Sequence, residues 1–182
     1  VALFVASNLI VSALFGYGSF SETSVENSAQ ALFYFAFGLP AFSLIKVFSS
    51  FFFARHDTKT PFYISLVSVL LNILISVLLF QKVGFIIIPI ATSISSWFNA
   101  IFLYIFSNKK DFFVFNDIFI YRFPRILISS LIMGLIFYFL LNLLNEKLIY
   151  SENLKFIYLL LSILLTLICY VVTSIFTKAF KL

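Results

Sequence analysis

Long apolar runs, separated by short polar breaks, extend from one end of the sequence to the other. A helix that crosses the hydrocarbon core of a bilayer needs about 20 mostly apolar residues. The runs that reach this length are 28–53, 61–80, 85–106, 126–144 and 154–176. This pattern predicts an all-α integral membrane protein, built as a polytopic helix bundle.

A further apolar run, residues 1–15, is too short to cross a bilayer and begins without a polar flank. It lacks the basic start and the small-residue cleavage site of a secretory signal peptide. We therefore expect it to be the second half of a truncated span. The chain would then be a fragment with about six transmembrane helices.

Turn and capping residues mark the ends of the predicted spans. The glycines of 16–18 permit the turn after the first run. Residues 23–26, Thr-Ser-Val-Glu, have the spacing of a capping box that opens the second helix. Residues 60–61 place a capping threonine before a proline at the first helical position. Gly84 separates the third and fourth spans, and Pro124 helps to end the connection before the fifth.

The composition excludes an ordinary soluble domain. The chain is 63% hydrophobic and 10% charged, whereas soluble domains have roughly 45–50% and 25%. The net charge of +5 comes from basic residues at the ends of apolar runs, too few and too scattered for nucleic-acid binding. The lone Cys169 lies inside an apolar run and has no partner for a disulfide.

Basic residues are distributed unevenly between alternate loops, which predicts the orientation, because cytoplasmic loops carry an excess of Lys and Arg. One side has eight: Arg55, Lys59, Lys109, Lys110, Arg122, Arg125, Lys178 and Lys181. The other side has three: Lys82, Lys147 and Lys155. We therefore expect the loop around Arg55 and the C-terminus to face the cytoplasm.

The connection 111–123 is too short and too charged to cross a membrane. It combines aromatic residues such as Phe112 and Tyr121 with charged residues such as Asp117. Aromatic side chains with a polar end settle at the headgroup level of a bilayer. We predict that this connection is an interfacial segment.

Small and hydroxyl-bearing residues line one face of the third and fourth spans. In the third they are Ser65, Ser68, Asn72 and Ser76, and in the fourth Ala91, Ser95 and Asn99 with Thr92, Ser96 and Ala100 beside them. Such residues mark contacts between membrane helices. Tight packing and a wet cavity both fit the hydroxyl groups. Because amides are costlier to bury, Asn72 and Asn99, with Ser95, are the candidates for a cavity lining.

Lys46 is the ionisable residue placed well inside a predicted span. It precedes Phe53 by seven residues, which is roughly 10 Å along a helix. A lysine can extend its ammonium over that distance to the membrane surface. Alternatively, Lys46 lines a cavity and meets an anionic group, since intramembrane charges are usually functional.

Three residues are candidates for a hinge or kink within spans. Pro40 follows Gly38 in the second span, and Pro89 lies near the start of the fourth. Proline removes a helical hydrogen bond and favours a kink. Irregular helices are common where transporters bend or bind, but they also occur elsewhere.

Charged residues follow the second span at the predicted cytoplasmic mouth: Arg55, Asp57 and Lys59. We expect them to set the topology and to pair with one another or with lipid headgroups. The single histidine, His56, excludes most catalytic constellations, and no phosphate-binding loop or metal-ligand cluster is present in the sequence. We therefore predict no catalytic residue, cofactor or metal, and a membrane transporter rather than an enzyme.

Two stretches carry a family resemblance. Residues 38–61 read Gly-Leu-Pro-Ala-Phe-Ser-Leu-Ile-Lys-Val-Phe-Ser-Ser-Phe-Phe-Phe-Ala-Arg-His-Asp-Thr-Lys-Thr-Pro, and residues 14–20 read Leu-Phe-Gly-Tyr-Gly-Ser-Phe. Both resemble the MurJ (MviN) family of lipid II flippases, in the MOP exporter superfamily. The later spans are similar mainly in order and spacing, including Gly84 and Trp97-x-Asn99-Ala100.

The resemblance implies a two-lobe transporter of about fourteen helices in the bacterial inner membrane. Such proteins move the undecaprenyl-linked peptidoglycan precursor, lipid II, between leaflets by alternating access. Residues 1–182 would be the C-terminal part of one lobe, in contact with lipid II and membrane lipids. Its final two helices would form a groove for the lipid tail. The basic residues that grip the pyrophosphate in this family would precede Val1.

Two alternatives remain open from the sequence. A member of the same superfamily could export another polyprenyl-linked saccharide or a drug. A membrane-embedded glycosyl- or acyltransferase would instead need carboxylates or a histidine in an external loop near the membrane. The available pairs are Glu22 with Glu26 and Glu146 with Glu152, and both have the pattern of solvated or capping residues.

Overall fold

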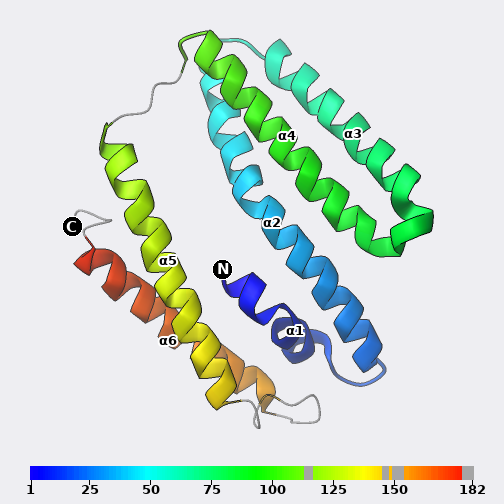
Figure 1. Cartoon of the computed structure of the whole chain (residues 1–182), viewed down its shortest axis with the longest axis vertical. Coiled ribbons are helices and arrows are strands. Elements are labelled where there is room, and N and C mark those ends of the chain that lie inside the picture. Colours follow the sequence, from blue (N-terminus) through cyan, green and yellow to red (C-terminus); the bar gives the residue numbers. More distant parts are fainter. Residues whose placement is uncertain (113–116, 145–147, 149–153, 178–182) are drawn as a thin grey trace. The chain divides into compact units, whose positions relative to one another are not determined.

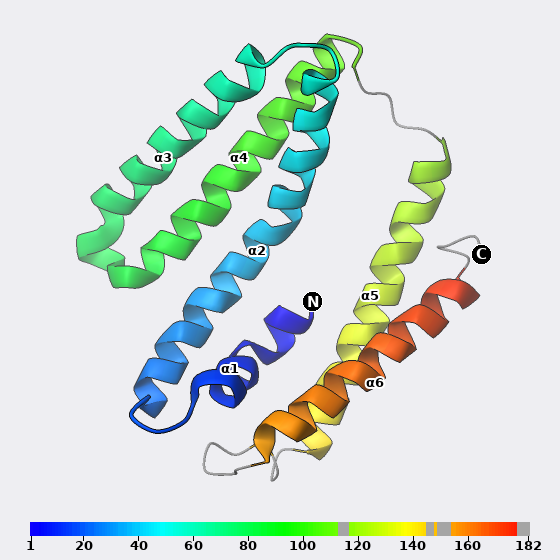
Figure 2. The same cartoon turned by 180° about the vertical axis from the view of Figure 1, so that it is seen from behind.

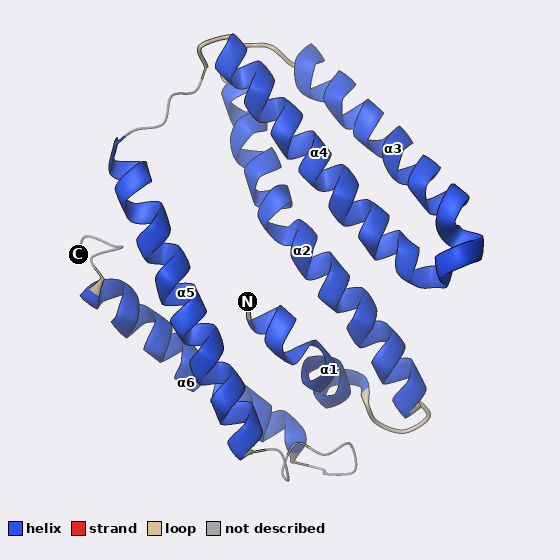
Figure 3. Ribbon diagram, in the orientation of Figure 1, coloured by secondary structure: helices blue, strands red, loops and turns tan. Residues whose placement is uncertain are grey.

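A computed structural model describes residues 1–112, 117–144, 148 and 154–177. Within these residues the regular structure is entirely helical, and no strand occurs (Figure 3). The elements in chain order are α1 (Ala2–Phe15), α2 (Glu22–Phe53), α3 (Lys59–Val83), the short 3-10 helix η1 (Gly84–Ile86), α4 (Ile87–Lys109), α5 (Asp117–Leu143) and α6 (Lys155–Phe176). The predicted all-α fold is confirmed.

Four stretches are long and apolar enough to cross a membrane: Glu22–Phe53, Lys59–Lys109, Tyr121–Leu143 and Lys155–Phe176. The second contains α3 and α4, which turn back on each other through η1. Gly84 makes this turn with a φ of +76°, a conformation that favours glycine. Large apolar side chains point outward along these helices, such as Val77, which is 69% exposed. Lipid rather than water is the solvent that suits such a surface.

The chain divides into two compact units (Figures 1 and 2). The first, Ala31–Val114, holds most of α2 with α3 and α4 and is called the α2–α4 unit below. Its core is formed by Phe48, Phe52, Ile64 and Leu103. The second, the α5–α6 unit, comprises Val1–Gln30 and Phe115–Leu182. There α5 and α6 pack together with α1 around a core that includes Ala6, Ala13, Phe137, Leu141 and Leu159.

The start of α2 differs from the prediction. The helix begins at Glu22, and the Ser21 hydroxyl accepts a hydrogen bond from the Ser24 backbone N–H at 3.2 Å. This bond is the N-cap interaction, because it satisfies one of the unpaired donors of the first turn. Residues 23–26 therefore lie inside the helix, and the predicted capping box is wrong.

The cap of α3 also differs. The Asp57 carboxylate accepts hydrogen bonds from the Thr60 backbone N–H at 3.1 Å and from the Thr60 hydroxyl at 2.8 Å. Thr60 is therefore a donor within the first turn, and the prediction that its hydroxyl caps the helix is wrong. Pro61 still occupies the first turn, where its missing N–H has no intrahelical partner.

The helix α5 begins at Asp117, nine residues before the predicted span 126–144. Pro124 lies inside this helix, so the prediction that it helps to end the preceding connection is wrong. Within the connection 111–123, residues 117–123 are helical and residues 113–116 lie outside the described part of the chain. The interfacial location of this segment stays a prediction.

Candidate functional site

Polar side chains of α3 and α4 meet in a hydrogen-bonded seam within the α2–α4 unit. The Asn72 side-chain amide donates to the hydroxyls of Thr92 at 3.2 Å and Ser95 at 3.3 Å. The Asn72 carbonyl oxygen accepts from the Ser76 hydroxyl at 3.3 Å. Asn99 donates to the Ser65 hydroxyl at 3.3 Å. The bonds to Thr92, Ser95 and Ser65 join two apolar helices, and in lipid such hydrogen bonds and small side chains drive helix association.

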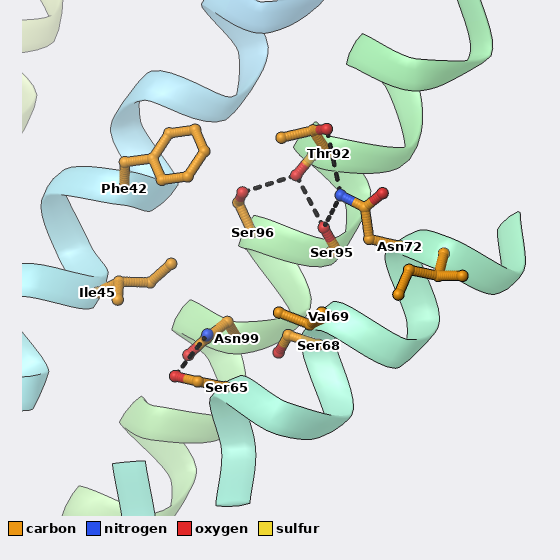
Figure 4. A pocket seen from close by; sticks show the side chains of 11 residues that line it. Phe42, Ile45, Ser65, Ser68, Val69, Asn72, Thr92, Ser95, Ser96 and Asn99 are labelled. Carbon is orange, nitrogen blue, oxygen red and sulfur yellow. Dashed lines mark hydrogen bonds between the residues drawn. The ribbon is translucent and has the colours of Figure 1, made fainter. Parts of the chain in front are cut away.

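A pocket of about 380 Å³ opens beside this seam (Figure 4). Its polar wall comes from α3 and α4, and its apolar wall includes Phe42 and Ile45 of α2. The structure thus brings together three of the predicted cavity residues: Asn72, Ser95 and Asn99. Lys46 does not line this pocket.

Asn99 carries an unsatisfied buried group at the pocket. The residue is only 8% exposed, and its Oδ1 atom has no hydrogen-bond partner among the described residues. Exchanging the amide oxygen and nitrogen would leave the other atom unpaired, because Ser65 offers one hydroxyl. Buried amide groups normally have partners for every strong donor or acceptor. This position therefore favours a bound polar group, such as water or part of a ligand.

The hinge candidates Gly38 and Pro40 lie where α2 crosses α4 closely. A methyl group added at Gly38 would lie 3.0 Å from the Ser93 Oγ atom and 3.4 Å from the Ser93 Cα atom. The Ser93 hydroxyl donates to the Tyr34 carbonyl at 2.7 Å, and the Trp97 indole N–H donates to the Phe37 carbonyl at 3.0 Å. Polar side chains of α4 thus bind backbone carbonyls of α2 in the turns before Pro40, on either side of the Ala36 carbonyl that the proline leaves without its helical donor.

Pro89 has a different setting. It is the third residue of α4, directly after η1. N–H groups in the first turn of a helix have no intrahelical acceptor. The expected loss of a helical hydrogen bond therefore does not apply to Pro89.

The predicted cytoplasmic mouth is a cluster that joins the α2–α3 turn to the end of α4. The Lys110 ammonium forms an ion pair with Asp57 and donates to the Thr60 hydroxyl at 3.1 Å. The Arg55 guanidinium lies 4.2 Å from the centre of the Phe112 ring. The hydrogen bond from Lys110, with those from Thr60, lowers the pKa of Asp57 from 3.8 to about 2.

The two chain reversals at this cluster have the same geometry. His56 has a φ of +59°, and the Asp57 N–H donates to the Phe52 carbonyl five residues back. Asp111 has a φ of +53°, and the Phe112 N–H donates to the Ser107 carbonyl in the same way. Both are Schellman motifs, which satisfy the last carbonyls of a helix.

The remaining predicted residues lie apart from the seam. Lys46 is exposed and lines a second pocket of about 570 Å³ between α2 and α3. Lys59 is exposed at the start of α3 and is outside both of these pockets. The basic partner of Asp57 is Lys110, which sequence reasoning counted only for the topology.

Sequence reasoning also missed the role of Lys155, in the α5–α6 unit. This residue begins α6 but is only 1% exposed. Its ammonium donates to the Gly16 carbonyl at 2.8 Å and lies 4.4 Å from the centre of the Tyr17 ring. An isolated lysine between a polar loop and an apolar run gives no sequence signal for such a contact.

Comparisons with known proteins agree on one family. A family model described as "Lipid II flippase MurJ" matches residues 1–160. Similar curated proteins, each named "Probable lipid II flippase MurJ", come from Rickettsia prowazekii (37% identity; 59% of this chain and 21% of that protein) and Rhizobium meliloti (35% identity; 75% and 26%). A third comes from Thermotoga maritima (39% identity; 57% and 22%). The chain thus spans about a quarter of the length of these relatives. Their names describe transporters, not enzymes.

Proposed function

This chain belongs to the lipid II flippase MurJ family, and from that premise we propose that it forms C-terminal helices of a lipid II flippase. The complete protein would move the undecaprenyl-linked precursor from the cytoplasmic to the periplasmic leaflet of the bacterial inner membrane. The name of each similar curated protein, "Probable lipid II flippase MurJ", supports this activity. It also weighs against the glycosyl- or acyltransferase alternative.

The observation that carries the proposal is the polar pocket of the α2–α4 unit. Asn99 presents an unpaired, buried amide atom there, next to the hydroxyls of Ser95 and Ser96. Buried polar groups in a structural seam are normally paired. The buried Ser107 hydroxyl also has no partner among the described residues, but it lies outside the pocket, whereas Asn99 lines it. A surface that is wetted in part of a transport cycle has this character, because water or a polar headgroup then supplies the partner.

A bend in α2 would suit alternating access. Gly38 and Pro40 weaken the helix at a point where Ser93 and Trp97 hold it through single hydrogen bonds to carbonyls. Discontinuous or bent helices serve as gates in many secondary transporters. We assign the hinge role to this pair and not to Pro89, which lies in a first turn.

The proposal also includes the orientation of the helices in the membrane. The excess of Lys and Arg at the α2–α3 turn and at the C-terminus supports a cytoplasmic location for both. The cluster of Arg55, Asp57 and Lys110 would then lie at the cytoplasmic surface.

Depletion of the intact protein in its host tests the activity. We expect lipid II to accumulate in the cytoplasmic leaflet, and a plasmid copy of the complete protein to restore its export. An Asn99→Leu copy should restore less export at equal protein level, whereas a Ser107→Ala copy, altered in the same helix outside the pocket, should restore it fully. Normal peptidoglycan synthesis after depletion would contradict the proposed function.

A further inference from the structure

The pocket that contains Lys46 has a lining that differs from that of the polar seam. Its volume is about 570 Å³, and it lies between the second half of α2 and the start of α3. Four polar residues line it: Lys46, Ser49, Thr58 and Ser65. The other walls are apolar and include Phe53 and Phe62.

The side-chain groups around this pocket are suited to donate hydrogen bonds. The Lys46 ammonium has three donors and no acceptor, and each hydroxyl can donate one hydrogen. The Ser65 oxygen already accepts from Asn99 at 3.3 Å, so its own hydrogen is free to point elsewhere. No carboxylate or side-chain amide lines the pocket. An oxyanion is the ligand class that such a lining complements.

The Lys46 charge is not neutralised within the described chain. No ion pair or hydrogen bond joins its ammonium to another described residue. Asp57, the carboxylate at the same end of α2, is already bonded to Lys110 and Thr60. Three hydroxyl-bearing residues line the same pocket as Lys46. An unpaired cation within a membrane-spanning helix favours an anionic partner.

We propose that the Lys46 pocket binds the phosphate group of a membrane lipid. The ammonium and the hydroxyls of Ser49 and Thr58 contact the phosphate oxygens, while Phe53 and Phe62 contact the adjoining hydrocarbon. A free inorganic anion would leave that apolar wall unused. The phosphate belongs either to an ordinary anionic phospholipid or to the polyisoprenoid pyrophosphate of the proposed cargo.

Binding to the complete purified protein tests this site without measuring transport. Two probes are titrated in neutral detergent: a short-chain phosphatidylglycerol and undecaprenyl pyrophosphate. Lys46→Gln should weaken the binding of at least one probe by about tenfold, the size of one charge-assisted hydrogen bond. Lys59→Gln is the matched control, because it removes a nearby lysine that lies outside the pocket, and it should change binding less than about twofold.

A second variant tests the site independently, in case Lys46→Gln fails to fold. Ser49→Ala combined with Thr58→Val keeps every charge, and it should weaken the same probe by several-fold. If the variants weaken the binding of both probes, the pocket is a general lipid-phosphate site. If they weaken only the binding of undecaprenyl pyrophosphate, the pocket is a site for the cargo. Equal effects of Lys46→Gln and Lys59→Gln, or no effect of either, would overturn the proposal. Because no transport is measured, a failed flippase assay would leave this result unchanged.

Discussion

The close crossing of α2 and α4 at Gly38 gives a prediction whose size follows from the structure. In Gly38→Ala the new methyl group would lie 3.0 Å from the Ser93 Oγ atom. The serine hydroxyl must then shift by a few tenths of an ångström, which strains its 2.7 Å hydrogen bond to the Tyr34 carbonyl. Overpacking of this kind costs about 1–3 kcal/mol, and the greater helix propensity of alanine returns about 1 kcal/mol.

We therefore expect Gly38→Ala to lower the free energy of unfolding by about 1 kcal/mol, the balance of these two effects. In the Ser93→Ala background the hydroxyl is absent, and the Phe42 ring, 3.3 Å from the added methyl group, can turn aside, so Gly38→Ala should be neutral or slightly stabilising. The coupling energy between the two substitutions should then be about 1–2 kcal/mol. Unfolding of the purified complete protein by sodium dodecyl sulfate, followed by circular dichroism, would measure it.

Ser96→Ala is the matched control. Ser96 is a buried serine of the same helix, but its hydroxyl donates to Thr92 within α4 and does not meet Gly38. Gly38→Ala and Ser96→Ala should add within about 0.5 kcal/mol. If Gly38→Ala had the same effect with and without the Ser93 hydroxyl, the close contact would not limit packing, and this reasoning would be refuted.

Three further predictions concern single side chains. Because hydrogen bonds lower the pKa of Asp57 from 3.8 to about 2, its ion pair stabilises the fold fully above about pH 4 and loses this effect as the pH falls towards 2. Unfolding curves at several pH values should show this dependence, and Asp57→Asn should remove it. Lys155→Met should cost about 1–3 kcal/mol of stability, because it leaves the Gly16 carbonyl without its donor. The same change at the exposed Lys82 should have little effect on the denaturation midpoint. Asn72→Leu should weaken the α3–α4 pair by about 1 kcal/mol, at roughly 0.6 kcal/mol for each hydrogen bond lost, which thermal unfolding would detect.

Some parts of the fold could be predicted because lipid imposes a simple rule. Every membrane helix must be long and apolar, so hydropathy alone located the helical segments. The polar faces of α3 and α4 followed from helical spacing, which placed Asn72 and Asn99 on the sides that meet. Asn72, Ser95 and Asn99 therefore line one pocket, whereas Lys46 lines another.

Other features depend on contacts that local patterns do not encode. Ser21 and Thr23 are similar caps by residue type, and in the structure Ser21 accepts the capping hydrogen bond. The Asp57–Lys110 ion pair joins residues 53 positions apart, and the Lys155–Gly16 bond joins residues 139 positions apart. Neither contact can be inferred from a single sequence.

The helix α4 carries two separate polar faces, and this separation indicates how the α2–α4 unit can move. Ser93 and Trp97 bond to carbonyls of α2, whereas Thr92 and Ser95 bond to Asn72 of α3. A bend at Gly38 would leave both sets intact, because the first set ends on the carbonyls of residues 34 and 37, just before the bend, and the second set does not involve α2. The α3–α4 seam would persist, so α3 and α4 would move as one body against the second half of α2. The pocket has walls from all three helices, and its volume would therefore change with the bend. A hinge at Gly38 and Pro40 would in this way control access to the unpaired amide of Asn99 without breaking the seam beside it.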